Sequence, residues 1–185
     1  MRIVIPVLLS AAVLGACARE RVASRPSIPQ VLLEENFDGE GDGVYQLNYT
    51  RFRQWRVTRG SVDLVGTPPF DDFLATEQGL YVDLDGTTEA AGTLESRESF
   101  ELAPGRYELR ILMAGCPRPQ QPSNTVIVSL GNVFQETITL PSYAPLQPYR
   151  RQITVRRATR GPLRFEHLGG DNYGIFVDDI QLRRL

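Results

Sequence analysis

The stretch Gly105-Arg-Tyr-Glu-Leu-Arg-Ile-Leu-Met113 decides the fold class of this 185-residue chain, because polar and apolar residues alternate along its length. Successive side chains of a strand point to opposite faces, so one face would be apolar and the other charged. The apolar members are Tyr107, Leu109, Ile111 and Met113, and the charged members are Arg106, Glu108 and Arg110. The stretch therefore predicts a strand that is buried on one face.

The preceding segment, 92–102, alternates in the same way, with Leu94, Phe100 and Leu102 on its apolar side. Ala103-Pro104-Gly105 joins the two segments. Proline presets the first angle of a turn and glycine accepts a positive φ, so these residues predict a hairpin.

Short strand signals punctuated by glycine and proline fill the rest of the chain, and no window of eleven or more residues shows a helical stripe. Strands at this spacing predict an all-β fold, an antiparallel sandwich forming a single domain over residues 31–185. The other strands are expected at 31–36, 54–58, 61–65, 79–84, 125–130, 135–140, 149–156, 163–168 and 174–182.

The N-terminus has a different character. An apolar run over residues 3–13 follows Arg2 and leads into Leu14-Gly15-Ala16-Cys17. The run is too short to cross a bilayer core of ~30 Å. The tetrapeptide resembles the lipobox of bacterial lipoproteins. That resemblance implies a signal peptide over 1–16, lipidation of Cys17, and export of a protein that its lipid anchors to a membrane. An ordinary secretory signal with a coincidental cysteine is the alternative.

Residues 17–30 carry arginines and prolines without periodicity, and we interpret them as a flexible tether. Ala18 follows the lipidated cysteine; in a bacterium with two membranes this resembles the signal for passage to the outer membrane. Cys116 is expected to be a small buried hydrophobe, and two cysteines exclude a thiolate-rich zinc site.

The net charge of −2 hides an asymmetry. Residues 17–102 hold 8 arginines against 16 acids, and residues 103–185 hold 11 arginines against 6 acids. The second part includes an arginine cluster, for which a solvated face and a site for an anionic polysaccharide or lipid headgroup are the alternatives. The acidic total and the predicted export disfavour nucleic acid. The cluster comprises Arg150, Arg151, Arg156, Arg157, Arg160 and Arg164.

Three stretches in order resemble galactose-binding-like jelly-roll domains, especially cellulose- and xylan-binding modules. They are Glu34-Glu-Asn-Phe-Asp-Gly39, Ala103-Pro-Gly-Arg-Tyr-Glu-Leu109 and Ile175-Phe-Val-Asp-Asp-Ile-Gln-Leu182. Three more resemble a subgroup of exported bacterial proteins, many of which carry an exosortase-type anchor. These are Gly60-Ser-Val-Asp-Leu-Val65, Gly79-Leu-Tyr-Val-Asp-Leu-Asp-Gly86 and Gly169-Gly-Asp-Asn-Tyr-Gly174.

The resemblance implies a structural calcium ion that ties the first strand to the last, with oxygen ligands of the kind calcium prefers. The matching positions are Glu35, Asn36 and Asp38, with Asp178 and Asp179 opposite. Val177 and Ile180 cannot share a face of a regular strand, which predicts a bulge between them. Ordinary turn and strand-end acids are the alternative.

Such modules hold sugar rings through exposed aromatic side chains, and the resemblance therefore makes Tyr143, Tyr149 and Tyr173 ligand candidates, with Arg151 beside them. Trp55 is expected in the core instead. Catalysis has little support, because His167 is the only histidine and shares strand parity with apolar residues. Asp83 and Asp85 share one face of a strand and are the candidate pair of carboxylates for glycoside hydrolysis.

The function predicted is a membrane-anchored, extracytoplasmic lipoprotein whose non-catalytic jelly-roll module binds glycan. A structural scaffold that contacts an envelope protein is the first alternative, and a glycan hydrolase the second.

Overall fold

The computed structural model describes residues 29–68, 74, 79–88, 90–117 and 122–185. Within these residues the chain forms strands and one short 3-10 turn, η1 (Gly41–Gly43), as an all-β fold requires. No helix of this described part is long and apolar enough to cross a membrane. The predicted signal peptide, Cys17 and nearly all of the predicted tether lie outside the described residues.

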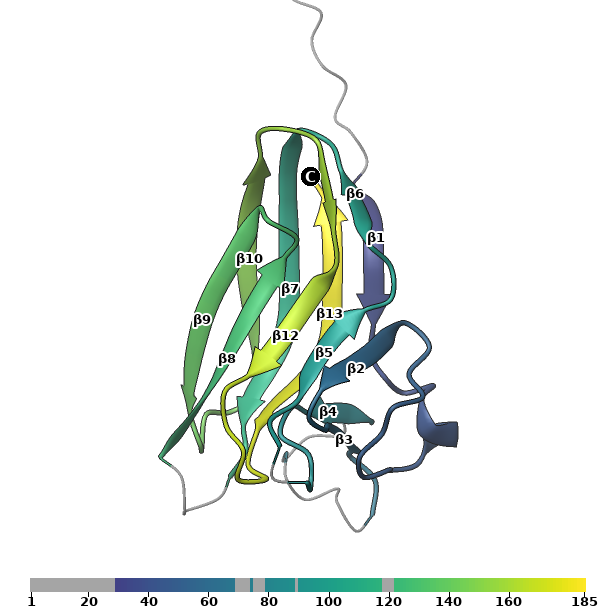
Figure 1. Cartoon of the computed structure of the whole chain (residues 1–185), viewed down its shortest axis with the longest axis vertical. Coiled ribbons are helices and arrows are strands. Elements are labelled where there is room, and N and C mark those ends of the chain that lie inside the picture. Colours follow the sequence, from purple (N-terminus) through teal and green to yellow (C-terminus); the bar gives the residue numbers. More distant parts are fainter. Residues whose placement is uncertain (1–28, 69–73, 75–78, 89, 118–121) are drawn as a thin grey trace, which may run out of the picture.

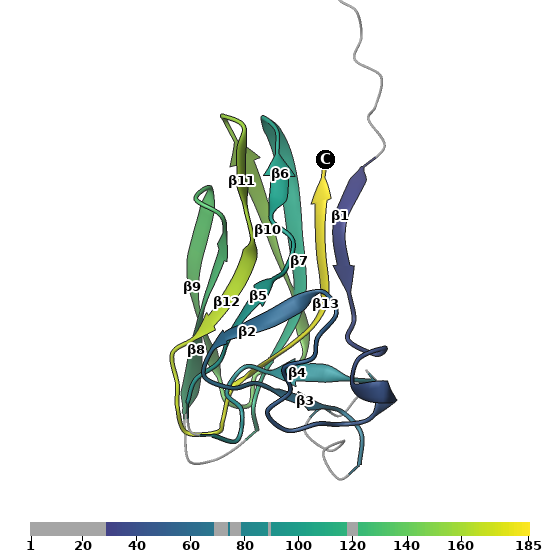
Figure 2. The same ribbon diagram turned by 45° about the vertical axis from the view of Figure 1, so that its right-hand side comes forward.

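The strands form two antiparallel sheets that face each other (Figures 1 and 2). The first has the order β10-β7-β13-β4-β3, with β1 also paired to β13: β1 (Gln30–Glu35), β3 (Asp63–Val65), β4 (Tyr81–Asp83), β7 (Gly105–Gly115), β10 (Gln147–Val155) and β13 (Ile175–Arg184). The second has the order β2-β5-β12-β8-β9: β2 (Trp55–Arg59), β5 (Thr93–Ser96), β8 (Ser123–Leu130), β9 (Phe134–Pro141) and β12 (Leu163–His167). The short strands β6 (Phe100–Leu102) and β11 (Thr159–Gly161) pair with each other.

The pairing is nested. β8 pairs with β9, β7 with β10, β6 with β11 and β5 with β12, so each pair encloses the previous one along the chain. β13 then pairs with β1, which joins the last strand to the first. A long antiparallel ribbon wrapped over two sheets in this way is a jelly roll. The prediction of an antiparallel jelly-roll sandwich is confirmed.

The core lies between the two sheets, where the alternating strands place their apolar rows. Tyr107, Leu109, Ile111 and Met113 are all buried there, as predicted. Trp55 is fully buried, and its ring centre lies 5.7 Å from that of Phe165 in β12, two strands away in the same sheet. Cys116 and His167 are buried too, again as predicted.

The predicted hairpin at Ala103–Gly105 is wrong in one respect. β6 pairs with β11, whereas β7 pairs with β10 and β13. The proline-glycine turn therefore carries the chain from one ladder to another. Alternation indicates which face of a strand is apolar, but both strands of a sandwich face the same core whether or not they are neighbours.

The predicted bulge is present in β13. The register against β7 shifts between Asp178 and Gln181, and Asp179 has a φ of 43°. This irregularity allows Val177 and Ile180 to be buried together.

Candidate functional site

Two of the predicted ligand residues meet at the open side of the sandwich, where the edge strands β9 and β10 face each other. The Nε and Nη2 atoms of Arg151 on β10 donate to the two carboxylate oxygens of Glu136 on β9, at 2.7 and 2.8 Å. Such a two-point, charge-assisted contact fixes the plane of the guanidinium group. The hydrogen bond from Arg151 lowers the pKa of Glu136, and Glu136 raises the pKa of Arg151.

Tyr149 completes this arrangement. The central carbon of the Arg151 guanidinium lies 3.9 Å from the centre of the Tyr149 ring, a cation–π geometry. Burial, and secondly the nearby Glu136, raises the pKa of the Tyr149 phenol. The ring therefore stays neutral and is held in place by a side chain that is itself fixed.

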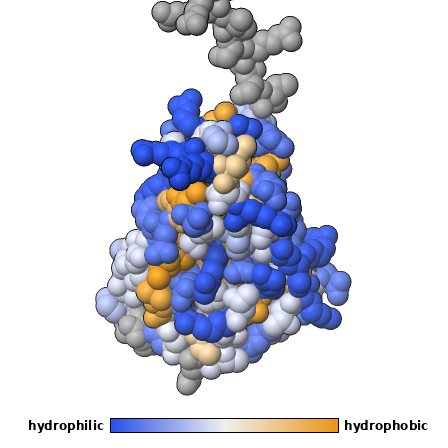
Figure 3. Space-filling view, turned by 45° about the horizontal axis from the view of Figure 1, so that its top comes forward, coloured by the Kyte–Doolittle hydropathy of each residue, from blue (hydrophilic) through white to orange (hydrophobic). Residues whose placement is uncertain are grey.

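A pocket of about 400 Å³ opens beside the ring, and we call it the Tyr149 pocket. It is lined by Met113, Leu140, Gln147, Pro148, Tyr149, Arg150 and Arg151. Apolar side chains thus line the pocket together with the polar residue Gln147 and with Arg151. A sugar ring has apolar faces and hydroxyl-bearing edges, so this combination suits it chemically. Figure 3 shows apolar side chains in a strip down the left of the molecule, the side on which β9 lies in Figure 1.

The other two predicted ligand tyrosines lie elsewhere. Tyr143, in the connection from β9 to β10, is 66% exposed but does not line the Tyr149 pocket. Tyr173, in the loop before β13, packs against a second small cluster that includes Tyr81, Cys116 and Phe176. The four predicted ligand residues therefore do not form one site.

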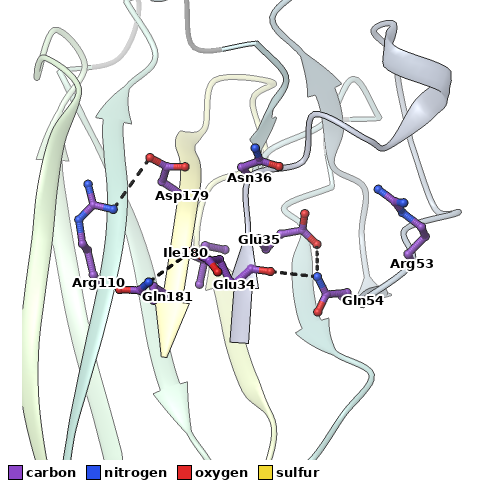
Figure 4. A pocket seen from close by; sticks show the side chains of 9 residues that line it. All are labelled: Glu34, Glu35, Asn36, Arg53, Gln54, Arg110, Asp179, Ile180 and Gln181. Atoms are coloured by element: carbon purple, nitrogen blue, oxygen red, sulfur yellow. Dashed lines mark hydrogen bonds and ion pairs between the residues drawn. The ribbon is translucent and has the colours of Figure 1, made fainter. Parts of the chain in front are cut away.

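The residues predicted to bind calcium lie where β1 meets β13. Glu35, Asn36 and Asp179 line a polar pocket of about 570 Å³, together with Glu34, Arg53, Gln54, Arg110, Ile180 and Gln181 (Figure 4). Glu35 accepts a hydrogen bond from the Gln54 amide at 3.1 Å, and Asp179 pairs with Arg110 at 3.9 Å. Asp38 and Asp178 do not line this pocket.

Asp178 is nevertheless electrostatically linked to these acids. Its pKa is raised to about 7, mainly by burial and secondarily by the charges of Asp179, Asp38 and Glu35, although the hydrogen bond from the N–H of Asp179 lowers it. A cation nearby would relieve this repulsion, and carboxylate and amide oxygens are suitable calcium ligands. Among the described residues, however, no three His, Cys, Asp or Glu side chains are grouped closely enough to hold a metal ion. Backbone and amide oxygens would have to complete such a site.

The three glycine- and aspartate-containing stretches of the exported subgroup come together at the end of the sandwich formed by β3, β4 and the loop before β13 (Figure 1). We call this the aspartate end: Asp63, Asp83, Asp85 and Asp171. Asp63 lies opposite Asp83 in the ladder, and Oδ2 of Asp85 accepts the backbone N–H of Asp171 at 3.0 Å. Gly174 packs so closely that an added Cβ would lie 1.9 Å from Oδ1 of Asp83.

The aspartate end has the character of a structural cluster. Burial raises the pKa of Asp83 well above its usual value, and the charges of Asp63 and Asp85 add to the effect. Asp85 is 1% exposed, and its own N–H donates to Oδ1 of Asp83 at 3.0 Å. Two buried carboxyl groups joined in this way do not flank a space for a glycosidic bond.

His167 lies next to Asp85, with 3.7 Å between Nδ1 and Oδ2. Its Nδ1 accepts the N–H of Gly169 at 3.1 Å, so this nitrogen carries no proton. Burial lowers the pKa of His167, against the opposing charges of Asp85 and Asp171. A neutral, fully buried imidazole fits the predicted inward role.

Sequence reasoning missed Glu136 and Gln147, which complete the Tyr149 pocket and its support. A signal for Glu136 existed, because this acid shares strand parity with Ile138 and Leu140 in β9. A charge in an otherwise apolar row indicates a partner across the sandwich. Gln147 shares strand parity with Tyr149 and Ile153 in β10 and carried the same signal. Gln54 and Gln181 carry no comparable signal, since each alternates with an apolar neighbour.

No protein-family model matches this chain, and a comparison with curated proteins finds no similar sequence. Several solved structures are similar to this chain at low identity. TmCBM61, solved with β-1,4-galactotriose, is 18% identical, with a TM-score of 0.47 over 82% of this chain and 95% of that one. The CBM22-1–GH10 modules of a Clostridium thermocellum xylanase, solved with xylohexaose, are 13% identical, with a TM-score of 0.49 over 84% of this chain and 28% of that one.

A third is the C-terminal CBM6 of LamC, a laminarinase from Zobellia galactanivorans, which is 10% identical. Its TM-score is 0.44 over 82% of this chain and 98% of that one. Similarities of this size do not identify a ligand, which has to be inferred from the residues of this chain.

Proposed function

We propose that this chain is an exported, lipid-anchored, non-catalytic module that binds a polysaccharide through the Tyr149 pocket. The observation that carries the proposal is the Tyr149 ring, fixed by Arg151, in a pocket that Gln147 also lines. An aromatic platform with adjacent hydrogen-bond donors is the arrangement that sugar rings require.

The ion pair beneath the ring strengthens this proposal. Ordering an interfacial side chain on binding costs about 0.5–1.5 kcal/mol. Arg151 is already held by Glu136 at two points, and Tyr149 is held by Arg151. A ligand that contacts the ring therefore binds side chains that are already ordered in the folded protein, so binding does not have to order them.

Polysaccharide pull-down tests the proposal. The chain from Ala18 to Leu185, which keeps every described strand, is incubated with insoluble xylan, galactan, β-glucan and cellulose. We expect at least one of these to retain the wild type and to lose Tyr149→Ala, whereas Tyr149→Phe, which keeps the ring, stays bound. Tyr143→Ala is the matched control, because that tyrosine is exposed outside the pocket.

Each variant is first melted to verify that it is folded. Retention of folded Tyr149→Ala at the wild-type level would move the site away from the pocket. Failure of the folded wild type to bind any glycan would favour the scaffold, with the apolar strip as its contact surface.

Anchoring rests on Cys17 and its resemblance to a lipobox. Several acyl chains at ~0.8 kcal/mol per buried methylene would hold the protein firmly on a membrane. We expect labelled palmitate to enter the wild type and not Cys17→Ser, with Cys116→Ser as the control that keeps the label. Label in Cys17→Ser would contradict lipidation at this residue.

Calcium is a further part of the proposal, supported by the negative charges of Asp179, Asp38 and Glu35 that act on Asp178. Glu35, Asn36, Asp38, Asp178 and Asp179 are the residues that would hold it. The ion would supply positive charge that links β1 to β13.

A further inference from the structure

The chain enters the sandwich at the same end at which its last strand finishes. Gln30, the first residue of β1, pairs with Arg184 near the end of β13. The N–H of Leu185 donates to the carbonyl of Arg106 at 2.8 Å, which brings the start of β7 to the same place. Figures 1 and 2 both show the start of β1 beside the C-terminus. The predicted tether therefore joins the domain at this end.

This end is rich in arginine, and we call it the arginine end: Arg106, Arg156, Arg157, Arg160, Arg183 and Arg184. They come from the start of β7, the turn between β10 and β11, β11 itself and the end of β13. Figure 3, which brings this end forward, shows hydrophilic side chains projecting from it.

Two of these six arginines form ion pairs, Arg160 with Glu101 and Arg183 with Glu108. Arg184 donates to the carbonyl of Pro104 at 2.9 Å and forms no ion pair within the described residues. Arg106, Arg156 and Arg157 are exposed and form no ion pair within the described residues.

The tether limits how far this surface can lie from its anchor. Gln30 lies thirteen residues after Cys17 in the sequence, a distance of at most about 45 Å even when the chain is fully extended. A flexible chain of that length has an end-to-end distance of roughly 20 Å. Arg19, Arg21 and Arg25 lie in this segment against a single acid, Glu20. The arginine end is thus held near any membrane to which Cys17 is attached.

We propose that the arginine end binds the anionic headgroups of the anchoring membrane and orients the domain on it. The proposal rests on the lipid anchor proposed above. Guanidinium groups match the geometry of phosphate oxygens, and basic side chains near an anionic bilayer are attracted within a Debye length of about 8 Å.

The orientation has a consequence for the glycan site. Tyr149 is near the start of β10, six residues before Val155 at the arginine end. At about 3.3 Å per residue, the pocket lies roughly 20 Å farther from the membrane than this surface. Headgroup binding would hold the Tyr149 pocket away from the bilayer, toward its ligand.

Vesicle sedimentation tests the proposal with the unlipidated chain from Ala18 to Leu185. We expect it to sediment with phosphatidylcholine vesicles containing phosphatidylglycerol, but not with pure phosphatidylcholine, and to be released by high salt. Arg106→Gln/Arg156→Gln/Arg157→Gln should bind roughly 100-fold more weakly, since each basic side chain near an anionic surface contributes about fivefold. Arg51→Gln/Arg56→Gln/Arg59→Gln removes the same charge elsewhere and should bind like the wild type.

Equal loss in the two triple variants would reduce the effect to net charge and overturn the proposal. The proposal would also be overturned if soluble polygalacturonate competes for the chain more strongly than the phosphatidylglycerol vesicles do. The arginine end would then bind an anionic polysaccharide. The palmitate experiment reports separately on Cys17, so a failure of the anchor and a failure of this surface are distinguishable.

Discussion

The aspartate end and the arginine end of the sandwich carry opposite charges, and they carry them in different ways. Asp63, Asp83 and Asp85 are 6%, 6% and 1% exposed and accept hydrogen bonds from backbone N–H groups. Arg106, Arg156 and Arg157 are exposed and form no ion pair in the described part of the chain. The buried acids and the exposed arginines thus lie at opposite ends of the sandwich.

This difference separates folding from binding. A buried carboxyl group costs free energy unless its neighbours satisfy it, so changes at the aspartate end should alter stability. An exposed arginine without a partner contributes little to stability, so changes at the arginine end should alter binding alone. Substitutions at the two ends can break or sharpen this comparison.

The largest effect is expected from Gly174→Ala. The new Cβ would lie 1.9 Å from Oδ1 of Asp83 and 2.6 Å from the backbone nitrogen of Asp85. Because both atoms belong to a buried network, we expect a loss of roughly 3 kcal/mol or more in the free energy of unfolding. Denaturant titration measures it. Thr154→Ala, at an exposed position near the arginine end, should change the free energy of unfolding by less than about 0.5 kcal/mol. Equal losses of stability in the two variants would refute the separation of folding from binding.

A smaller effect is expected from Asp178→Asn. The pKa of Asp178 is raised to about 7, first by burial and then by neighbouring carboxylates. A carboxyl whose pKa is higher in the folded state stabilises fully below its unfolded pKa, and this contribution is lost as the pH rises toward 7. In chelator at pH 8 we therefore expect the variant to be the more stable, by roughly 2 kcal/mol.

Calcium sharpens this prediction. If the ion binds as proposed, adding calcium at pH 8 raises the melting temperature of the wild type and leaves Asp178→Asn unchanged. Glu101→Gln, at the arginine end, should respond to calcium like the wild type. An identical response of wild type and Asp178→Asn would place any bound calcium elsewhere.

The smallest effect is expected at the arginine end itself. Arg106→Gln/Arg156→Gln/Arg157→Gln should change the free energy of unfolding by less than about 0.5 kcal/mol, although it loses vesicle binding. Thermal and denaturant unfolding measure this. A destabilisation as large as that of Gly174→Ala would show that these arginines serve the fold.

The sequence predicted those parts of the fold that depend on local periodicity. Alternation placed β7, and the clash of parity between Val177 and Ile180 predicted the bulge in β13. The inward positions of Trp55 and His167 followed from the same rule. Each of these features depends on which face of its strand a side chain occupies, and the two-residue alternation of the sequence indicates that face directly.

Pairing between distant segments was not predictable in this way. The turn at Pro104 joins two strands that are not paired with each other. The sequence did not reveal this, because the alternation of β6 is compatible with any neighbouring strand. Glu136 and Arg151 lie 15 residues apart on different sheets, and only the fold brings them together. Tyr149 and Arg151 were identified from composition and resemblance, but their contact, and the separation of Tyr143 and Tyr173 from them, required the topology.

An NMR titration of the isotope-labelled chain with xylo-, galacto- and laminari-oligosaccharides tests glycan binding at the Tyr149 pocket most directly. We predict that at least one of them shifts the amide signals of Gln147, Tyr149 and Arg150, while the signals of Arg157 and Arg184 stay in place. Shifts confined to the arginine end or to the pocket around Gln181, or no shifts with any sugar, would contradict the account.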